Sequence, residues 1–180
     1  MALITTKTGD RGMTQLGPDR ISSKTHPIIT IQGGLDELSC ALGLSGDKFD
    51  SIQTFLSEVM GYLYYRQIDE KRMAEQVEVL EEYITSHNNS IPTWFVNPRG
   101  AASFARAVCR RVERNVVEFS ESERQKPESE RYMNMDPIMQ YLNRLSDYLF
   151  VKSFERAVPD QPQLFEDELA AEQLPLVAVG

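Results

Sequence analysis

The chain has 180 residues, of which 41% are hydrophobic and 26% charged, and its formal net charge is -8. This length and balance are typical of one domain over residues 1–180, with enough apolar side chains for a sizeable core. The acidic balance, with a pI near 4.9, argues against a nucleic-acid partner. Since no apolar run reaches the length of a membrane span and the N-terminus shows no signal-peptide pattern, we expect a cytoplasmic protein without membrane contact.

The first 33 residues are rich in Thr, Gly, Asp, Ser and Pro, which predicts a loop over residues 1–33. Gly9 and Gly12 flank an Asp-Arg pair, and glycine allows backbone N–H groups to approach a ligand closely. Hydroxyl and cationic side chains surround these glycines: Thr6, Lys7, Thr8, Arg11, Thr14 and Lys24. This inventory suits a polyphosphate, although it matches neither the P-loop nor the dinucleotide glycine pattern. An ordinary surface loop is the alternative.

Three amphipathic helices are predicted next, at about residues 34–45, 50–67 and 69–85. In the first of them, Leu35, Leu38 and Leu42 form the stripe that we expect to be buried. Asp36 and Glu37 fall in its first turn, where the helix dipole favours acidic side chains.

Cysteine and histidine are scarce. Cys40 and Cys109 both fall within apolar helical patterns, which predicts buried thiols in a reducing compartment rather than a disulfide. The two histidines, His26 and His87, form no cluster with metal-ligand spacing. The sequence therefore predicts no metal site built from protein ligands.

The fourth predicted helix, Ala101–Phe119, carries two stripes. The apolar stripe is expected to be buried and consists of Phe104, Val108, Val112, Val116 and Phe119. The charged stripe arises because residues four apart stack on the same side of a helix, and it consists of Arg106, Arg110 and Arg114 with Glu113 beside them. Aligned guanidinium groups suit phosphate oxygens, and a solvated polar face is the alternative.

The segments around this helix are predicted to be irregular. The preceding loop, residues 86–100, contains Trp94 and Phe95, which either anchor the loop on the core or contact a flat, apolar ligand. Residues 120–136 are highly polar and predict an exposed connection. The tail, residues 158–180, is acidic and then apolar, and it either docks on the domain or is disordered.

A fifth helix is predicted from Asp136, as its cap, to about Arg156, with Pro137 at the first helical position. Asn143 is mildly unfavourable inside this helix, and a hydrogen bond to a neighbouring helix would explain it. Together the patterns predict an all-α fold, an antiparallel up-and-down bundle of five helices with polar loops and no strands.

Four separated segments add a family signature. They read T-K-T-G-D-R-G-M-T-Q-L-G at residues 6–17, L-D-E-L-S-C-A-L-G at 35–43, R-A-V-C-R-R-V-E-R at 106–114 and Y-L-N-R-L-S-D-Y-L-F at 141–150. In this order and at this spacing they resemble the PduO-type ATP:cob(I)alamin (corrinoid) adenosyltransferase family over about residues 3–157. The resemblance favours a functional reading of the arginine stripe and of the N-terminal loop.

The resemblance implies transfer of the 5'-deoxyadenosyl group of ATP to the cobalt of cob(I)alamin, giving adenosylcobalamin and triphosphate. The family fold is an antiparallel helix bundle, usually a homotrimer with each active site between neighbouring subunits. ATP is then the co-substrate, with Mg²⁺, and cobalamin the substrate, while a flavin-type reductase and a B12-dependent enzyme are the implied partners. The alternative is a catalytically weak or inactive ATP- and corrinoid-binding chaperone or sensor of the same fold.

Carried over by position, the resemblance assigns the ATP site to two groups of residues. The N-terminal group is Thr6, Lys7, Thr8, Gly9, Thr14, Gln15 and Lys24. The helical group is Arg110, Arg111, Glu113, Arg114 and Asn143. Asp36 would pair with an arginine of the fourth helix across the subunit boundary, and Phe95 would pack under the corrin and help exclude the lower axial ligand from cobalt. Arg110, Phe95 and Asp36 are thus the candidate catalytic residues.

Two departures from the family pattern fall nearer the expected corrin side than the ATP loop. The stretch N-P-R-G-A-A-S at residues 97–103 stands where the family has P-G-G and a longer run, with Arg99 in a glycine position. The connection after Tyr65 is also short. Both departures bear on the cobalamin half of the site, whereas the motifs of the ATP half are intact.

Overall fold

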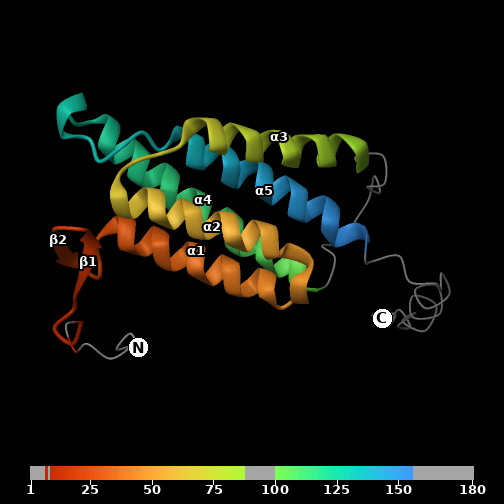
Figure 1. Cartoon of the computed structure of the whole chain (residues 1–180), viewed down its shortest axis with the longest axis horizontal. Helices are drawn as coiled ribbons and strands as arrows, with labels where there is room; N and C mark the ends of the chain where they lie inside the picture. Colours follow the sequence, from red (N-terminus) through yellow and green to blue (C-terminus); the bar gives the residue numbers. More distant parts are fainter. Residues whose placement is uncertain (1–6, 8, 88–99, 156–180) are drawn as a thin grey trace, which may run out of the picture.

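The computed structural model describes residue 7 and residues 9–87 and 100–155, drawn in colour in Figure 1. Within these residues lie five α-helices: α1 (Pro27–Gly43), α2 (Asp50–Tyr65), α3 (Glu70–His87), α4 (Ala101–Arg124) and α5 (Asp136–Glu155). A two-stranded sheet and two 3-10 turns complete the described structure: β1 (Met13–Gly17), β2 (Arg20–Ser23), η1 (Gly46–Phe49) and η3 (Glu128–Glu130). No helix among the described residues is long and apolar enough to cross a membrane.

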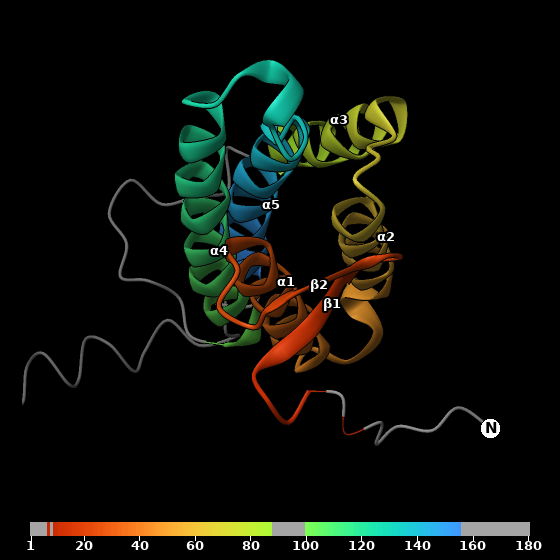
Figure 2. The same cartoon turned by 90° about the vertical axis from the view of Figure 1, so that its left-hand side faces the viewer.

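The five helices run alternately up and down the long axis of the molecule (Figure 1). Helix α4 packs against both α1 and α5, while α2 packs on α1 and α3 packs on α5. The end-on view shows α1, α4 and α5 close together, with α2 and α3 to one side (Figure 2). The predicted antiparallel bundle of five helices is therefore confirmed, and the predicted ends of α2, α3 and α5 lie within two residues of those observed.

The prediction that residues 1–33 form only a loop is wrong for part of this segment. Strands β1 and β2 pair antiparallel, with Thr14 opposite Ser22 and Gln15 opposite Ile21. The register shifts between Gln15 and Gly17, and the side chain of the intervening Leu16 is 4% exposed and packs into the bundle core. One buried leucine in a short, polar hairpin gives too weak an alternation to be read as a strand.

Helix α1 begins at Pro27, seven residues before the predicted start. His26 is its cap, because its Nδ1 accepts a hydrogen bond from the Ile28 N–H at 3.2 Å, and proline suits the first helical position. Asp36 and Glu37 consequently lie in the middle of α1 and not in its first turn. The Gly33-Gly34 pair, which reads as a helix start, has a packing role: a Cβ on Gly34 would lie 2.8 Å from Val112 Cγ2, so the glycine allows α1 and α4 to approach closely.

The apolar face of α4 differs from the prediction at its beginning. Phe104 is 53% exposed, so its placement in the buried stripe is wrong. The buried positions follow alternating steps of three and four residues, which keeps them on one face. They are Ala102, Ala105, Cys109, Val112, Val116, Phe119 and Glu123, with Val108 beside them. Since α4 continues to Arg124, the predicted connection begins five residues later than expected.

The two cysteines occupy different environments. Cys40 is exposed, so the prediction that it is buried is wrong, whereas Cys109 is buried as predicted. The Cys109 thiol donates to the Leu142 carbonyl oxygen on α5 at 3.3 Å. Burial raises the pKa of this thiol, so it remains protonated at neutral pH and serves packing rather than reactivity.

Tyr132, in the connection between α4 and α5, ties the hairpin to the bundle. Its hydroxyl donates to the Leu63 carbonyl oxygen at 2.7 Å and accepts from Arg20 Nη2 at 3.1 Å. Arg66, in the left-handed conformation that ends α2, places its guanidinium 4.4 Å from the centre of the Tyr132 ring and donates from Nε to the Tyr132 carbonyl oxygen at 2.8 Å. We call Arg20, Arg66 and Tyr132 the Tyr132 anchor.

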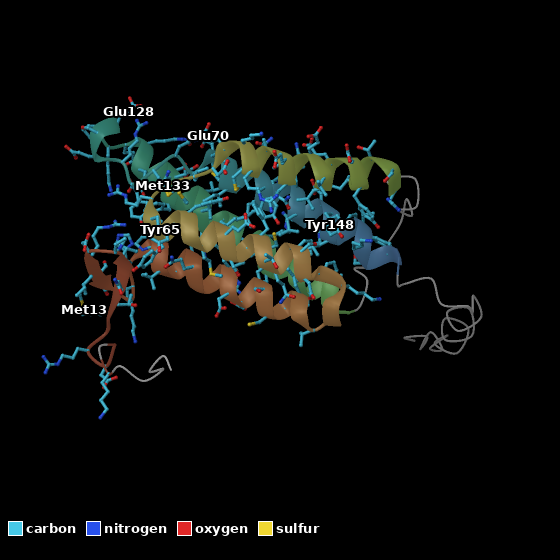
Figure 3. The ribbon with its side chains drawn as sticks, viewed as in Figure 1. Met13, Tyr65, Glu70, Glu128, Met133 and Tyr148 are labelled. Atoms are coloured by element: carbon cyan, nitrogen blue, oxygen red, sulfur yellow. The ribbon has the colours of Figure 1, made fainter. Side chains whose placement is uncertain are left out.

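A buried carboxylate completes this junction. Glu123 accepts hydrogen bonds from Lys126 Nζ at 2.6 Å and from the backbone N–H of Tyr132. Burial alone would raise the pKa of the Glu123 carboxyl, but these two hydrogen bonds hold that pKa below its ordinary value. Met13 of the hairpin, Tyr65 at the end of α2 and Glu128 all lie toward this end of the long axis, while Tyr148 lies toward the other (Figure 3).

Helix α5 begins at Asp136, which is therefore its first helical residue rather than the predicted cap. The Asp136 N–H donates to Asn134 Oδ1 at 3.1 Å, and the carbonyl oxygen of Met135 accepts the first helical hydrogen bond from the Met139 N–H. The Asp136 carboxylate accepts from Arg124 Nη2 at 2.6 Å, which links the end of α4 to the start of α5.

Candidate active site

A pocket of about 400 Å³ lies along α4 where it meets Asn143 of α5. Its lining residues are Arg110, Glu113, Arg114, Val117, Glu118, Glu121 and Asn143. The α4 members recur at spacings of three and four, on a different side of the helix from the buried stripe. Four residues of the predicted helical group are therefore brought together by one face of α4 and one residue of α5. We call this the α4–α5 pocket.

Asn143 is held to α4 by a hydrogen bond from its Nδ2 to Glu113 Oε1 at 3.1 Å. The sequence predicted such a bond to a neighbouring helix as the reason for an asparagine inside α5, and the structure confirms it. The bond links the two side chains across the α4–α5 interface, where the buried Cys109 thiol also donates to the Leu142 carbonyl oxygen.

Arg110 and Arg114 are the two cationic side chains that line the pocket. Among the described residues neither guanidinium takes part in an ion pair, although Glu118 and Glu121 line the same pocket. Guanidinium groups are planar, permanently charged and shaped to bind phosphate oxygens through two N–H groups. The pocket thus offers two free cationic groups one helical turn apart.

The third arginine of the predicted stripe does not line this pocket. The Arg106 guanidinium lies 4.7 Å from the centre of the Phe150 ring on α5, and Arg106 is half-buried there. Burial and the nearby positive charge of Arg110 lower the pKa of Arg106, while Asp147 opposes this effect. Arg106 remains charged at neutral pH and contributes a cation–π contact between α4 and α5.

Arg111 is also separate from the α4–α5 pocket. It forms an ion pair with Glu37 of α1, and the hydrogen bond from Arg111 to this carboxylate raises the pKa of Arg111. Because one residue along a helix is a rotation of about 100°, Arg110 and Arg111 lie on different sides of α4. Asp36, next to Glu37, is exposed on α1.

The predicted N-terminal group is placed on and before the hairpin. Thr14 and Gln15 line a second pocket, of about 430 Å³, on the hairpin itself. The Lys24 backbone N–H donates to the Gly12 carbonyl oxygen at 2.8 Å, and a Cβ on Gly9 would lie 3.0 Å from Lys24 Nζ. Gly9 therefore gives the Lys24 side chain room to pass over the loop. Lys7 is exposed and has a φ of 58°.

Within the described residues of one chain, the two halves of the predicted ATP site line separate pockets. The α4–α5 pocket and the hairpin pocket have no lining residue in common among the described residues. Thr6, Thr8 and Phe95 lie outside the described residues, as do Trp94 and the tail at residues 158–180. The structure thus brings Arg110, Glu113, Arg114 and Asn143 together in one pocket. Thr14, Gln15, Gly9 and Lys24 lie outside that pocket lining. Arg111 faces α1, where it pairs with Glu37.

Sequence reasoning missed three lining residues: Val117, Glu118 and Glu121. Their signal was present, because they continue the spacing of three and four from Arg110 and Arg114. Glu121 was not considered because the predicted helix ended at Phe119. Among the described residues, no group of three or more His, Cys, Asp or Glu side chains could hold a metal ion.

Comparison with known proteins shows which family this chain is similar to. The family model for cobalamin adenosyltransferases matches residues 4–155. A cobalamin adenosyltransferase from Cupriavidus metallidurans is 34% identical over 172 residues, which cover 84% of this chain and 86% of that protein. The corrinoid adenosyltransferase MMAB from Bos taurus is 31% identical over 173 residues, covering 82% of this chain and 68% of that protein.

Two solved structures share the fold. Both are variants of a PduO-type ATP:corrinoid adenosyltransferase from Lactobacillus reuteri. One, complexed with ATP, has a TM-score of 0.68 at 26% identity and covers 86% of this chain and 93% of its own. The other, complexed with cobalamin and ATP, has a TM-score of 0.69 at 24% identity and covers 86% of this chain and 94% of its own.

The fold and the pocket define a helical-bundle protein with two arginines in a pocket where α4 meets α5. This chain belongs to the cobalamin adenosyltransferase family. The resemblance noted from the four sequence segments is thereby confirmed.

Proposed function

We propose that this chain is an ATP:corrinoid adenosyltransferase, which transfers the 5'-deoxyadenosyl group of ATP to the cobalt of cob(I)alamin and releases triphosphate. The observation that carries the proposal is the α4–α5 pocket, where Arg110 and Arg114 form no ion pair with another described residue and Asn143 is hydrogen-bonded to Glu113. Membership of the family supplies the reaction, and the solved relative complexed with cobalamin and ATP supports both ligands.

The residue types suit this reaction. Cob(I) cobalt is itself a strong nucleophile, so the protein needs no nucleophilic serine, cysteine or histidine. It must hold the ribose 5'-carbon in line with cobalt and stabilise the leaving triphosphate. Arg110 and Arg114 would bind phosphate oxygens and neutralise the charge that develops as the C5'–O bond breaks, while Asn143 would contribute a polar contact to the nucleotide. The electron pair of the broken bond remains on the triphosphate oxygen.

ATP is proposed to enter with Mg²⁺. The Glu118 and Glu121 carboxylates in the α4–α5 pocket provide oxygen donors, the ligand type that Mg²⁺ prefers, so the donor set fits the ion. When bound, Mg²⁺ would neutralise phosphate charge, most of its ligands being phosphate oxygens and water. The arginines would act on the remaining phosphate oxygens.

The active site is proposed to form between two subunits of a homotrimer. The separation of the hairpin pocket from the α4–α5 pocket in one chain supports this arrangement, because both halves are needed to surround one ATP. In the trimer, Thr6, Lys7, Thr8, Gly9, Thr14, Gln15 and Lys24 of one subunit would bind the ATP held by Arg110, Glu113 and Arg114 of its neighbour. Asp36, exposed on α1, would pair with an arginine of α4 in that neighbour.

The corrin half of the site rests on Phe95, which is proposed to lie under the corrin and exclude the lower axial ligand. Removing that ligand makes reduction of cobalt to the cob(I) state easier. A flavin-type reductase that delivers the electron and a B12-dependent enzyme that receives the product are the proposed partners, in the cytoplasm.

The test is an anaerobic spectroscopic assay with purified protein, chemically generated cob(I)alamin, ATP and Mg²⁺. We expect the spectrum of adenosylcobalamin to appear with enzyme and not without it. If ATP binds by calorimetry but no product forms, the enzyme proposal is refuted and a binding role of the same fold replaces it.

A further inference from the structure

A chain of side-chain hydrogen bonds runs from the α4–α5 pocket to α3, a helix that contributes no residue to the pocket lining. Arg144, next to Asn143 on α5, donates from Nη1 to Asn143 Oδ1 at 2.8 Å. The same guanidinium donates from Nε to Glu81 Oε1 on α3 at 2.6 Å. With the bond from Asn143 to Glu113, the order is Glu81, Arg144, Asn143, Glu113, which spans α3, α5 and α4.

The two neighbours of Asn143 determine which way its amide faces. A guanidinium can only donate hydrogen bonds, and an ionised carboxylate can only accept them. Arg144 therefore requires the Oδ1 of Asn143, and Glu113 requires its Nδ2. The flipped amide would direct N–H groups at the guanidinium and an oxygen at the carboxylate, so both hydrogen bonds would be replaced by repulsive contacts.

Glu81 determines where the Arg144 guanidinium lies. A long arginine side chain on an exposed helix face has several rotamers, and the ion pair with Glu81 selects one of them. Asp147, one turn further along α5, lies 3.9 Å from Arg144 Nη1 and adds a weaker attraction on the same side. Both ion-pair partners are partly exposed, so this pair contributes little to global stability.

We propose that Arg144, held by Glu81, is a positioning residue for the nucleotide site: it fixes the Asn143 amide in the single orientation in which Asn143 binds both Glu113 and ATP. This inference rests on the proposed function, because it assigns a positioning role within the ATP site. It also gives α3 a role in nucleotide binding that neither the pocket lining nor the sequence motif indicates.

The test compares ATP affinity in Arg144→Met, Asn143→Ala and the double variant, measured by calorimetry without cobalamin on the full chain. Arg144→Met should weaken ATP binding about tenfold with little change in Tm, because the pair is partly exposed. Asn143→Ala should weaken it by a similar factor. The double variant should be no weaker than Asn143→Ala alone, because Arg144 acts through Asn143.

A matched control is Arg124→Met. Arg124 is also partly exposed and also donates to a carboxylate at 2.6 Å, but its partner is Asp136 and it does not touch Asn143. This variant should keep wild-type ATP affinity. A second variant, Glu81→Gln, alters α3 without changing α5. It should weaken ATP binding about threefold in the wild-type background. In the Asn143→Ala background it should have no effect on ATP binding.

Three results would overturn the proposal: unchanged ATP affinity in Arg144→Met, a double variant weakened by the product of the two single effects, or an equal loss in Arg124→Met. The second of these would mean that Arg144 contacts ATP or acts independently of Asn143. If the wild-type chain binds no ATP, the proposed function itself fails, whereas wild-type binding with a normal Arg144→Met variant removes only the positioning role.

Discussion

The two halves of the proposed ATP site are built in different ways. The α4–α5 half lies on two long, closely packed helices, and its Asn143–Glu113 pair is held by a hydrogen bond within the chain. The N-terminal half lies on and around a hairpin with strands of five and four residues, which meets the bundle through Leu16 and the Tyr132 anchor. The side chains proposed to bind ATP in this half, such as Lys7 and Lys24, are exposed.

The two halves differ in what fixes their residues in place. The packed helices fix the backbone from which Arg110 and Arg114 extend, which would reduce the cost of ordering these side chains around triphosphate. The hairpin instead carries Thr14 and Gln15 in another pocket, where the proposed trimer would place them beside a neighbouring subunit. Four changes to the chain test this difference between the α4–α5 half and the N-terminal half.

The variant with the largest expected effect on the α4–α5 half is Arg110→Ala. Removing a guanidinium that stabilises the leaving triphosphate should lower kcat/KM by about 10²- to 10³-fold. Because Arg110 forms no ion pair among the described residues, circular dichroism and the urea unfolding midpoint should stay at wild-type values. Near-normal turnover in a folded Arg110→Ala protein would remove this residue from the mechanism.

The hairpin half is tested at its anchor by Tyr132→Phe. The change removes the hydroxyl that binds the Leu63 carbonyl oxygen and Arg20, so the free energy of unfolding should fall by about 1–3 kcal/mol. ATP affinity should also fall, because the hairpin loses its register on the bundle. Tyr65→Phe, at a tyrosine that is largely exposed, is the control and should change neither urea unfolding nor ATP affinity. An unaltered Tyr132→Phe protein would mean that Leu16 alone holds the hairpin.

Helix α1 follows the hairpin and packs on α4, and Gly34→Ala probes this contact. The new Cβ would meet the stiff, branched Val112 side chain at 2.8 Å, which should cost about 1–2 kcal/mol in urea unfolding. Gly33→Ala meets no atom within 4 Å and should instead stabilise the helix by about 0.5–1 kcal/mol. Equal effects of the two changes would contradict close packing of α1 on α4.

The smallest effect concerns pH at the start of α1. Burial and the positive charge of Arg20 lower the pKa of His26, with Lys126 acting in the same direction and Glu123 against it. The neutral ring is therefore favoured in the folded state, so its contribution to stability is complete above about pH 6.5 and is lost as the pH falls through that value toward the folded-state pKa. The low pKa of Glu123 adds a further loss only in more acidic solution.

His26→Asn isolates this contribution, because asparagine also caps helices but does not titrate. Urea unfolding at about pH 7.5 and about pH 5.5 should show a smaller loss of stability for His26→Asn than for the wild-type chain. An identical loss in both proteins would assign the pH dependence to other groups.

The sequence predicts the bundle well because periodicity reports burial along each long helix. The prediction of the start of α1 fails because Gly33 and Gly34 suggest a helix boundary. Gly34 instead lies against Val112 of α4, a contact that the local sequence does not reveal. The prediction for Phe104 fails because a step of four residues is compatible with two neighbouring faces of α4. The ion pair of Arg111 with Glu37 depends on how α1 packs on α4, which no local pattern encodes.

For the site, motif resemblance places Arg110, Glu113, Arg114 and Asn143 in one group, and the structure brings them together. The resemblance places the N-terminal residues in the same site, but within one chain Thr14 and Gln15 line a different pocket. A motif carries no information about which subunit supplies each segment. The role of Arg144 is likewise invisible in sequence, because it depends on Glu81 reaching across from another helix.

The central claim, that each active site combines the hairpin of one chain with the α4–α5 pocket of another, is tested most directly by mixing subunits. Arg110→Ala and Lys24→Ala chains are co-expressed, and the mixed oligomers are assayed anaerobically for adenosylcobalamin beside each variant alone. If sites form between chains, random mixing leaves about a quarter of them intact, and the mixture should recover that fraction of wild-type activity while each variant alone stays inactive. If the mixture is as inactive as the separate variants, each site lies within one chain and the account is contradicted.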